Sequence, residues 1–260
     1  MIKELFDTLL FSGIVIWAYM TFWFLVSLII KRNDVADFAW GLGFVVVSIS
    51  SFIKLANYTF TSIAITSLVI IWGLRLSYHI GSRNLKKSED SRYKVWRDTW
   101  GKWFILRSYL QVYILQGFLM LVIVSPVLIV YTYPKERVSP LVILSILIWI
   151  FGFIFEVVSD NQLRKFVKNR EDNKSIMKSG LWKYSRHPNY FGEITQWWAI
   201  GIIAFISSYG WLSIAGPLTI TFLIVFVSGI PMLENKYSDR EEFQEYKKHT
   251  SKLIPLPPNK

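Results

Sequence analysis

The chain has 260 residues, of which 53% are hydrophobic and 17% aromatic, and its formal net charge is +11. Such an apolar composition indicates an integral membrane protein, and because the basic residues lie between apolar segments, we expect contact with membrane lipids and not with nucleic acid. Cysteine is absent, which excludes disulfides, thiolate metal sites and thiol catalysis. The three histidines are too scattered for the histidine boxes of a di-iron enzyme, and we expect no metal.

Apolar segments predict an all-α membrane protein with about seven transmembrane helices in a single domain over residues 1–260. We expect the first span to be a retained helix and not a cleaved signal peptide, because no small-residue cleavage pattern follows. Pro126 is expected to interrupt the fourth span. The expected spans lie near residues 9–30, 38–53, 60–80, 108–131, 141–158, 189–207 and 211–232, with polar loops at 81–107 and 159–188 and a charged tail at 233–260.

Basic residues are distributed unevenly among these loops. The loop after the first span, the two long loops and the tail hold 24 of the 29 Lys and Arg residues. Because positively charged loops remain on the cytoplasmic side, we expect the N-terminus outside and the C-terminus in the cytoplasm. In the loop 81–107, Trp96, Trp100 and Trp103 recur at helical spacing and predict an amphipathic helix at the membrane interface.

The segment Ser179 to Trp198, SGLWKYSRHPNYFGEITQWW, combines the most polar chemistry with the start of an apolar helix. Pro188 fixes its own φ and disfavours helix at His187, so we expect the helix to begin at Pro188 or Asn189. The free N–H groups of its first turn would attract an anion or a phosphate. Glu193 lies within a span, where a carboxylate indicates function, although it would also favour the helix dipole.

Other polar residues near the cytoplasmic ends of spans have two interpretations each. Arg75 would bind an anionic partner or extend its side chain to the membrane surface, with Tyr78 and His79 on the same helix face. Glu156, Asp160 and Arg164 share a helical stripe that would form an ion-pair ladder or a site.

Asp37 would cap the second span or act in catalysis. The GLG at 41–43 lacks the third glycine of a dinucleotide fingerprint. In the tail, Tyr237 and Arg240 would lie on an interfacial helix, close over a cofactor, or do both.

Four blocks resemble the steroid 5α-reductase-like membrane reductases, in particular a bacterial branch formerly described as a domain of unknown function. They are LRLSYHIGSRN in the third span, SDNQLR at 159–164, GLWKYSRHPNYFGE at 180–193, and the tail from Glu234 to Pro255. The core RHPNYFG is less specific, because RHPxYxG also occurs in isoprenylcysteine and phospholipid methyltransferases.

The resemblance implies an oxidoreductase that uses NADPH to reduce a carbon–carbon double bond conjugated to a carbonyl in a steroid-like or other lipid substrate. By position, Asn189 and Glu193 would lie near the nicotinamide amide and Arg75 near the phosphates. The resemblance also implies that Asp160 and Arg164 face the cofactor. Arg186, His187 and Tyr190 fit this region chemically, and Arg186 and His187 match the bacterial branch only. From the tail we add Tyr237 and Arg240.

One departure from the family concerns the enone oxygen. The steroid reductases donate hydrogen bonds to it from a Glu and a Tyr, and the tyrosine position is Trp72 here. Asp37 and Tyr78 are the available substitutes, and the family's Glu has no clear counterpart. We therefore expect Tyr78 and Asp37 to be catalytic, with a steroid itself a doubtful substrate.

Two other classes of function remain open. An S-adenosylmethionine-dependent membrane methyltransferase would bind its cofactor at the same positively charged cytoplasmic segments. It would need fewer cations there, because its cofactor carries a sulfonium. A transporter or non-catalytic lipid-binding protein would need a polar path across the bilayer, which the outer halves of the last four spans do not provide. For the reductase we expect a bacterial inner membrane or the endoplasmic reticulum, with the cofactor site facing the cytoplasm.

Overall fold

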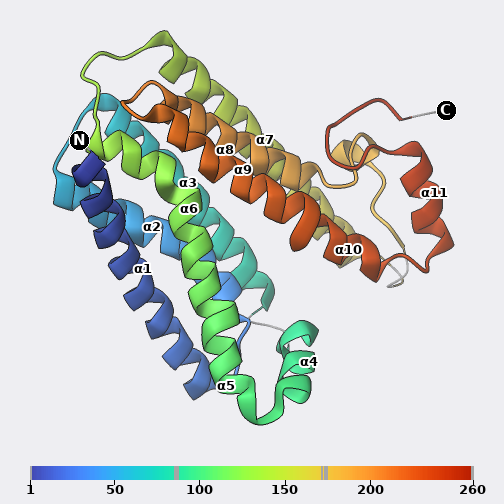
Figure 1. Ribbon diagram of the computed structural model, residues 1–260. Helices are drawn as coiled ribbons and strands as arrows, with labels where there is room; N and C mark the ends of the chain where they lie inside the picture. The colour runs from blue at the N-terminus through green and yellow to red at the C-terminus, as the bar shows by residue number, and fades with distance from the viewer. Residues whose placement is uncertain (1, 85–87, 171, 173–174, 259–260) are drawn as a thin grey trace. The chain divides into compact units, whose positions relative to one another are not determined.

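The computed structural model describes residues 2–84, 88–170, 172 and 175–258, and every regular element within these ranges is a helix (Figure 1). The expected all-α fold is confirmed. Parts of the expected loops and tail, at residues 85–87, 171, 173–174 and 259–260, lie outside the described residues. The chain forms two compact units, which are described separately: unit 1, Met1–Val138 with Ile203–Gly216, and unit 2, Ser139–Ile202 with Pro217–Lys260. The expectation of a single domain stays a prediction.

Unit 1 is built on four long helices, of which α1 packs against α2 and α6, and α2 packs against α3. Shorter elements connect α3 to α6, and a short 3-10 helix returns to this unit late in the chain. Their bounds are α1 Ile2–Ile30, α2 Val35–Leu55, α3 Phe60–Asn84, α4 Ser91–Trp100, η1 Gly101–Trp103, α5 Phe104–Arg107, η2 Ser108–Ile114, α6 Leu115–Thr132 and η4 Gly210–Ile214.

Unit 2 contains one long helix, α7, and the chemically rich segment that follows it. Two of its helices, α8 and α9, have a few residues in unit 1. The bounds are α7 Pro140–Asn169, η3 Gly180–Lys183, α8 Pro188–Phe205, α9 Ala215–Phe222, η5 Leu223–Val227, α10 Ile230–Lys236 and α11 Glu241–His249.

Six of the described helical segments are long and apolar enough to cross a membrane, in agreement with an integral membrane protein. The seventh expected span, α8, has 18 residues but carries Asn189, Glu193 and Gln196, which lower its apolarity. The number of spans and their orientation therefore stay predictions.

The starts of α7 and α8 follow local chemistry, whereas the start of α2 does not lie where the sequence predicts it. As expected, α8 begins at Pro188, and α7 begins with Pro140 behind a Ser139 cap whose Oγ accepts from Leu141 N at 3.3 Å. The interpretation of Asp37 as a helix cap is wrong. The residue preceding α2 is Asp34, because the chain turns at Lys31, with φ 55°, and becomes helical again at Val35.

The expected interruption at Pro126 is also wrong, because α6 continues through it from Leu115 to Thr132. The irregularity lies earlier, where η2 is a π-helix over Ser108–Ile114. Such wide turns occur often at functional sites. The Trp-rich segment forms helix α4, in which the rings of Trp96 and Trp100 stack with centroids 5.1 Å apart, but the helix ends at Trp100 and the third expected member, Trp103, lies in the 3-10 helix η1.

The GLG segment serves helix packing in unit 1. A Cβ at Gly41 would lie 2.6 Å from the carbonyl oxygen of Gly73, and a Cβ at Gly73 would lie 2.6 Å from that of Gly41. Only glycine at both positions allows α2 and α3 to approach this closely.

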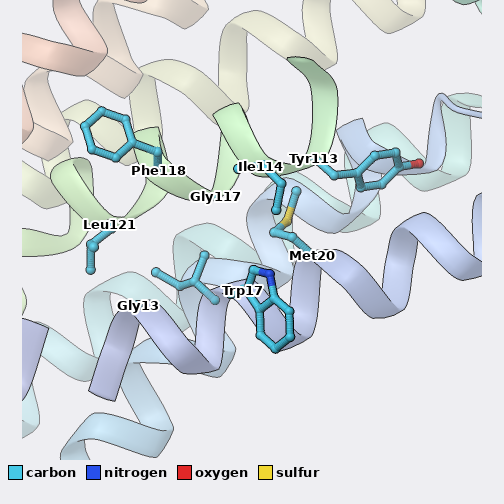
Figure 2. A pocket seen from close by; sticks show the side chains of 9 residues that line it. Gly13, Trp17, Met20, Tyr113, Ile114, Gly117, Phe118 and Leu121 are labelled. Carbon is cyan, nitrogen blue, oxygen red and sulfur yellow. The ribbon is translucent and has the colours of Figure 1, made fainter. Parts of the chain in front are cut away.

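An apolar groove of about 130 Å³ lies between α1, η2 and α6 (Figure 2). Its lining residues include Gly13 and Trp17 of α1 and Gly117 and Phe118 of α6. The ring of Tyr113 points its hydroxyl away from the groove, toward the carbonyl oxygen of Asn33 at 3.5 Å. None of the residues expected to be functional lines this groove.

Candidate functional site

The seam between α7 and α8 in unit 2 depends on two glycines. A Cβ at Gly192 would lie 2.6 Å from the carbonyl oxygen of Gly152 and 2.7 Å from the amide nitrogen of Glu156. A Cβ at Gly152 would lie 2.8 Å from the carbonyl oxygen of Gly192. This close approach brings polar side chains of the two helices together.

Two carboxylate–amide pairs follow along this seam. Gln196 donates from Nε2 to Glu156 Oε2 at 2.7 Å, and Asn189 donates from Nδ2 to Asp160 Oδ1 at 3.2 Å. Glu156, Asp160 and Gln196 are at most 7% exposed. The side-chain oxygens of the same two amides, Asn189 Oδ1 and Gln196 Oε1, are buried and have no hydrogen-bond partner among the described residues. Since unsatisfied buried acceptors are uncommon, these two atoms are available to a ligand that donates hydrogen bonds.

Arg186 lies two residues before the start of α8, and its guanidinium donates hydrogen bonds to other groups of the protein. Its Nε and Nη2 each lie 2.9 Å from Glu234 Oε1. Its Nη1 donates to the carbonyl oxygens of Thr250 and Lys247, at 2.6 and 3.2 Å. The side chain is only 6% exposed. Arg186 therefore ties three distant segments of unit 2 together.

His187 shares the same carboxylate. Its Nε2 lies 3.1 Å from Glu234 Oε1, and its ring stacks on Tyr190 with centroids 5.7 Å apart. Burial lowers the pKa of His187, and the hydrogen bond to Glu234 offsets only part of this effect. The imidazole is consequently neutral at physiological pH. We call Arg186, His187 and Glu234 the entrance cluster, because Arg186 and His187 directly precede the first residue of α8, Pro188.

The tail packs onto the segment before α8. Arg186 N donates to Ser251 O at 2.8 Å and Leu256 N to Tyr184 O at 3.0 Å, while Ser185 Oγ donates to Leu253 O at 2.7 Å. Burial raises the pKa of the Tyr246 phenol, which donates to the carbonyl oxygen of Trp182.

The tail contains an amphipathic helix, α11, whose buried residues are Phe243 and Tyr246, but it begins at Glu241, after Tyr237 and Arg240. Tyr237 and Arg240 lie between α10 and α11, with the Arg240 guanidinium 4.8 Å from the centre of the Tyr237 ring. This contact lies within the tail, so the expectation that Tyr237 and Arg240 lie on an interfacial helix is wrong.

The other expected site residues of unit 2 lie near this seam or at its end. Glu193 is half-buried on α8, one helical turn beyond Asn189. Arg164 is exposed and donates from Nη2 to Asn161 Oδ1 at 2.9 Å.

Three expected residues belong to unit 1. Arg75 is half-buried on α3, and Tyr78 exposes 71% of its surface. Asp37, in the first turn of α2, accepts from the hydroxyl of Tyr93 at 3.0 Å. Tyr93 is only 2% exposed, whereas Asp37 is half-buried.

Sequence reasoning omitted four residues that the structure associates with these groups. The sequence places Glu156 on one helical stripe with Asp160 and Arg164 without a cofactor role, and it indicates no role for Gln196 or Glu234. Tyr93 precedes Trp96 by three residues, and their rings meet at 5.3 Å. Its position on the same face of the amphipathic helix was the available signal.

Comparison with known proteins identifies the family. A family model described as "Protein of unknown function (DUF1295)" matches residues 23–250, and the chain therefore belongs to that family. No solved structure matches the chain. The match to this family agrees with the resemblance expected from the motifs.

The chain is also distantly similar to proteins named 3-oxo-5-alpha-steroid 4-dehydrogenase 1. It is 28% identical to the Macaca fascicularis protein over 109 residues, which cover 42% of this chain and 38% of that protein. The Homo sapiens protein gives 28% over 109 residues, covering 42% and 39%, and the Rattus norvegicus protein 25% over 127 residues, covering 48% and 45%. The matched region thus spans less than half the length of these relatives.

Proposed function

We propose that this member of the DUF1295 family is an integral membrane reductase that uses NADPH to reduce a carbon–carbon double bond conjugated to a carbonyl in a lipid-like substrate. The relatives named as steroid dehydrogenases support the reaction class. The observation that carries the cofactor assignment is the buried, unpartnered Oδ1 of Asn189, one turn from Glu193 at the start of α8.

The residues of the α7–α8 seam fit the carboxamide end of a nicotinamide cofactor. A carboxamide presents two N–H donors and one acceptor, and Asn189 Oδ1 would accept from one of the donors. Asp160 holds Asn189 in place through the 3.2 Å bond to Nδ2, which fixes the orientation of the amide. Glu193 would accept from the second donor.

The phosphates of the cofactor need cations that are not already committed. Arg186 is engaged with Glu234 and two carbonyl oxygens, so we assign it to holding the entrance and not to phosphate binding. The side chains of Lys183, Arg164 and Lys252 in unit 2 are exposed and would neutralise phosphate charge as mobile partners. The role of Arg75 at the phosphates rests on the resemblance alone.

When bound, NADPH would supply a hydride to the carbon β to the carbonyl and become NADP⁺, and a proton from solvent at the α carbon would complete the saturated product. The negative charge that develops on the carbonyl oxygen needs a hydrogen-bond donor in a water-poor site, which contributes about 3 to 4 kcal/mol of barrier lowering. Asp37 and Tyr78 are the residues proposed for this role from sequence. The buried Tyr93 beside Asp37 is a third: its single O–H proton donates to Asp37 Oδ1 at 3.0 Å and would turn from that carboxylate to the carbonyl oxygen when substrate binds, and its burial favours it over the exposed Tyr78.

A ligand titration tests the cofactor assignment. The purified protein in detergent is titrated with NADPH, NADH and S-adenosylmethionine, and its thermal stability is followed. A ligand present at 100 times its Kd stabilises the folded state by roughly 2.7 kcal/mol. We expect NADPH to stabilise the protein; stabilisation by S-adenosylmethionine alone would favour the methyltransferase instead.

Two variants of α8 make the titration specific. Asn189→Ala removes the unpartnered acceptor and should abolish the response to NADPH. Thr195→Val is the matched control on the same helix, because the Thr195 hydroxyl only donates to the carbonyl oxygen of Phe191 at 2.7 Å. Equal NADPH responses from both variants would remove Asn189 from the site.

A further inference from the structure

The two ring nitrogens of His187 differ in their hydrogen bonding to the described residues. The residue is 5% exposed, and its Nε2 lies 3.1 Å from Glu234 Oε1. Within the described part of the chain, Nδ1 has no hydrogen-bond partner. Nδ1 is not among the fully buried unpartnered atoms of the described residues, so a ligand or water can reach it although the rest of the residue is buried.

The chemistry of Glu234 decides which nitrogen carries the proton. Its Oε1 receives the Nε and Nη2 of Arg186, both at 2.9 Å, and Lys247 Nζ lies 3.6 Å from Oε2. Surrounded by these cations, Glu234 is a carboxylate and therefore only accepts hydrogen bonds. Nε2 of His187 must then be the donor, and in a neutral imidazole Nδ1 is left as a pure acceptor.

The ring is held in a fixed orientation. It stacks on Tyr190 at an interplanar angle of 20°, and the backbone N–H of His187 donates to Ser185 Oγ at 3.1 Å. The acceptor Nδ1 thus has a defined position two residues before Asn189. The start of α8 consequently offers two acceptors, Nδ1 of His187 and Oδ1 of Asn189, to a ligand.

We infer that Glu234 is a positioning residue that holds His187 as the Nε2–H tautomer, so that Nδ1 accepts a hydrogen bond from a hydroxyl or amide group of the ligand at the start of α8. The identity of that ligand as a dinucleotide rests on the proposed function. The tautomer of His187 and the positioning role of Glu234 do not depend on the proposed function.

Nitrogen NMR of the protein labelled at histidine tests the tautomer without any ligand. The signals of His187 are assigned by comparison with His187→Gln, because the chain has only three histidines. At neutral pH we expect Nε2 to show the shift of a protonated nitrogen and Nδ1 that of a bare one, and Glu234→Gln to give a mixture of tautomers. A protonated Nδ1 in the unmodified protein would overturn the inference.

Substitution of His187 separates positioning from ligand contact. In His187→Gln the amide Nε2 takes the place of the imidazole Nε2 and still donates to Glu234, while the Nδ1 acceptor is lost. We expect near-normal thermal stability and an NADPH Kd raised roughly fivefold to tenfold, the effect of one lost hydrogen bond. His187→Asn should lose stability, because its amide cannot reach Glu234. An unchanged NADPH Kd in His187→Gln would refute the ligand contact.

The two proposals fail in different ways. If the unmodified protein does not bind NADPH, the proposed function is wrong, and the NMR signals alone decide whether Glu234 sets the tautomer. If the unmodified protein binds NADPH and His187→Gln binds it equally well, the proposed function stands and the inference is wrong.

Discussion

Gly192→Ala tests whether the α7–α8 seam is as tight as described. The added methyl carbon would lie 2.6 Å from the carbonyl oxygen of Gly152, 2.7 Å from Glu156 N and 2.8 Å from Glu156 Cβ. Ordinary contacts between nonbonded heavy atoms are about 3.5 to 4.0 Å, so the helices must separate by about 1 Å. Two of the three overlaps are with backbone atoms, which no rotamer change relieves.

The expected cost follows from this overlap. Overpacking of this kind typically destabilises by about 1 to 3 kcal/mol, and the better helix propensity of alanine returns up to about 1 kcal/mol. We expect a net loss of about 1 to 2 kcal/mol, which lowers the midpoint of thermal unfolding by about 2 to 4 °C per kcal/mol. The displacement should also lengthen the Glu156–Gln196 and Asp160–Asn189 bonds and weaken the response to NADPH.

Thermal unfolding in detergent, with and without NADPH, is the assay. The control is Gly13→Ala on α1, where the nearest atom to the new Cβ is Leu121 Cδ2 at an ordinary 3.6 Å. This variant should unfold within a degree or two of the unmodified protein. If Gly192→Ala behaves like Gly13→Ala, the two helices do not cross at Gly152 and Gly192, and the geometry of the seam is wrong.

Three further predictions concern the entrance cluster and unit 1. Because the pKa of His187 is lowered from its ordinary 6.5, the unfolded chain binds a proton at this site more readily than the folded protein. The contribution of the neutral imidazole to the free energy of unfolding should therefore be fully present above about pH 6.5 and be lost as the pH decreases. Thermal midpoints measured against pH should show that His187→Gln loses part of this dependence. Arg186→Ala leaves Glu234 without its main cation and should cost about 3 to 5 kcal/mol, with earlier proteolysis of the tail in a timed digest; a tail cleaved at the unmodified rate would contradict the contacts described. Tyr93→Phe should reduce the rate of enone reduction more than Tyr78→Phe, measured as NADPH oxidation in proteoliposomes, and the reverse order would restore Tyr78 as the donor.

Local signals in the sequence predicted much of the fold. Hydropathy located the six helical segments that are long and apolar enough to cross a membrane, and the fixed φ of Pro188 located the first residue of α8. The same reasoning placed an interruption at Pro126, where the helix continues, and did not indicate the π-helix at Ser108–Ile114. Proline removes one backbone donor, and the packing around α6 decides whether the helix tolerates that loss.

The candidate site was predictable only one segment at a time. The block RHPNYFGE singled out Arg186, His187 and Asn189, but their partners are distant in the chain. Glu234 follows His187 by 47 residues, and Asp160 precedes Asn189 by 29. Such pairings arise from helix packing, which no local periodicity encodes. The family resemblance therefore named residues, whereas the structure supplied their contacts.

The assignment of Arg186 illustrates the difference. In sequence, an arginine before a helix N-terminus indicates an anion-binding role. In the structure its donors go to Glu234 and to the carbonyl oxygens of Lys247 and Thr250. Glu234 lies near the end of another segment, where charge and spacing alone do not indicate which cation it binds.

Transfer of hydrogen isotope from cofactor to substrate tests the central claim most directly. The protein in proteoliposomes is incubated with NADPH that carries deuterium at the transferable ring position and with lipid enones, including an unsaturated keto steroid, and the products are analysed by mass spectrometry. The account predicts one deuterium on the carbon β to the carbonyl, formed by the unmodified protein and by Thr195→Val but not by Asn189→Ala. Transfer of a methyl group from S-adenosylmethionine, with no deuterium in any product, would contradict it.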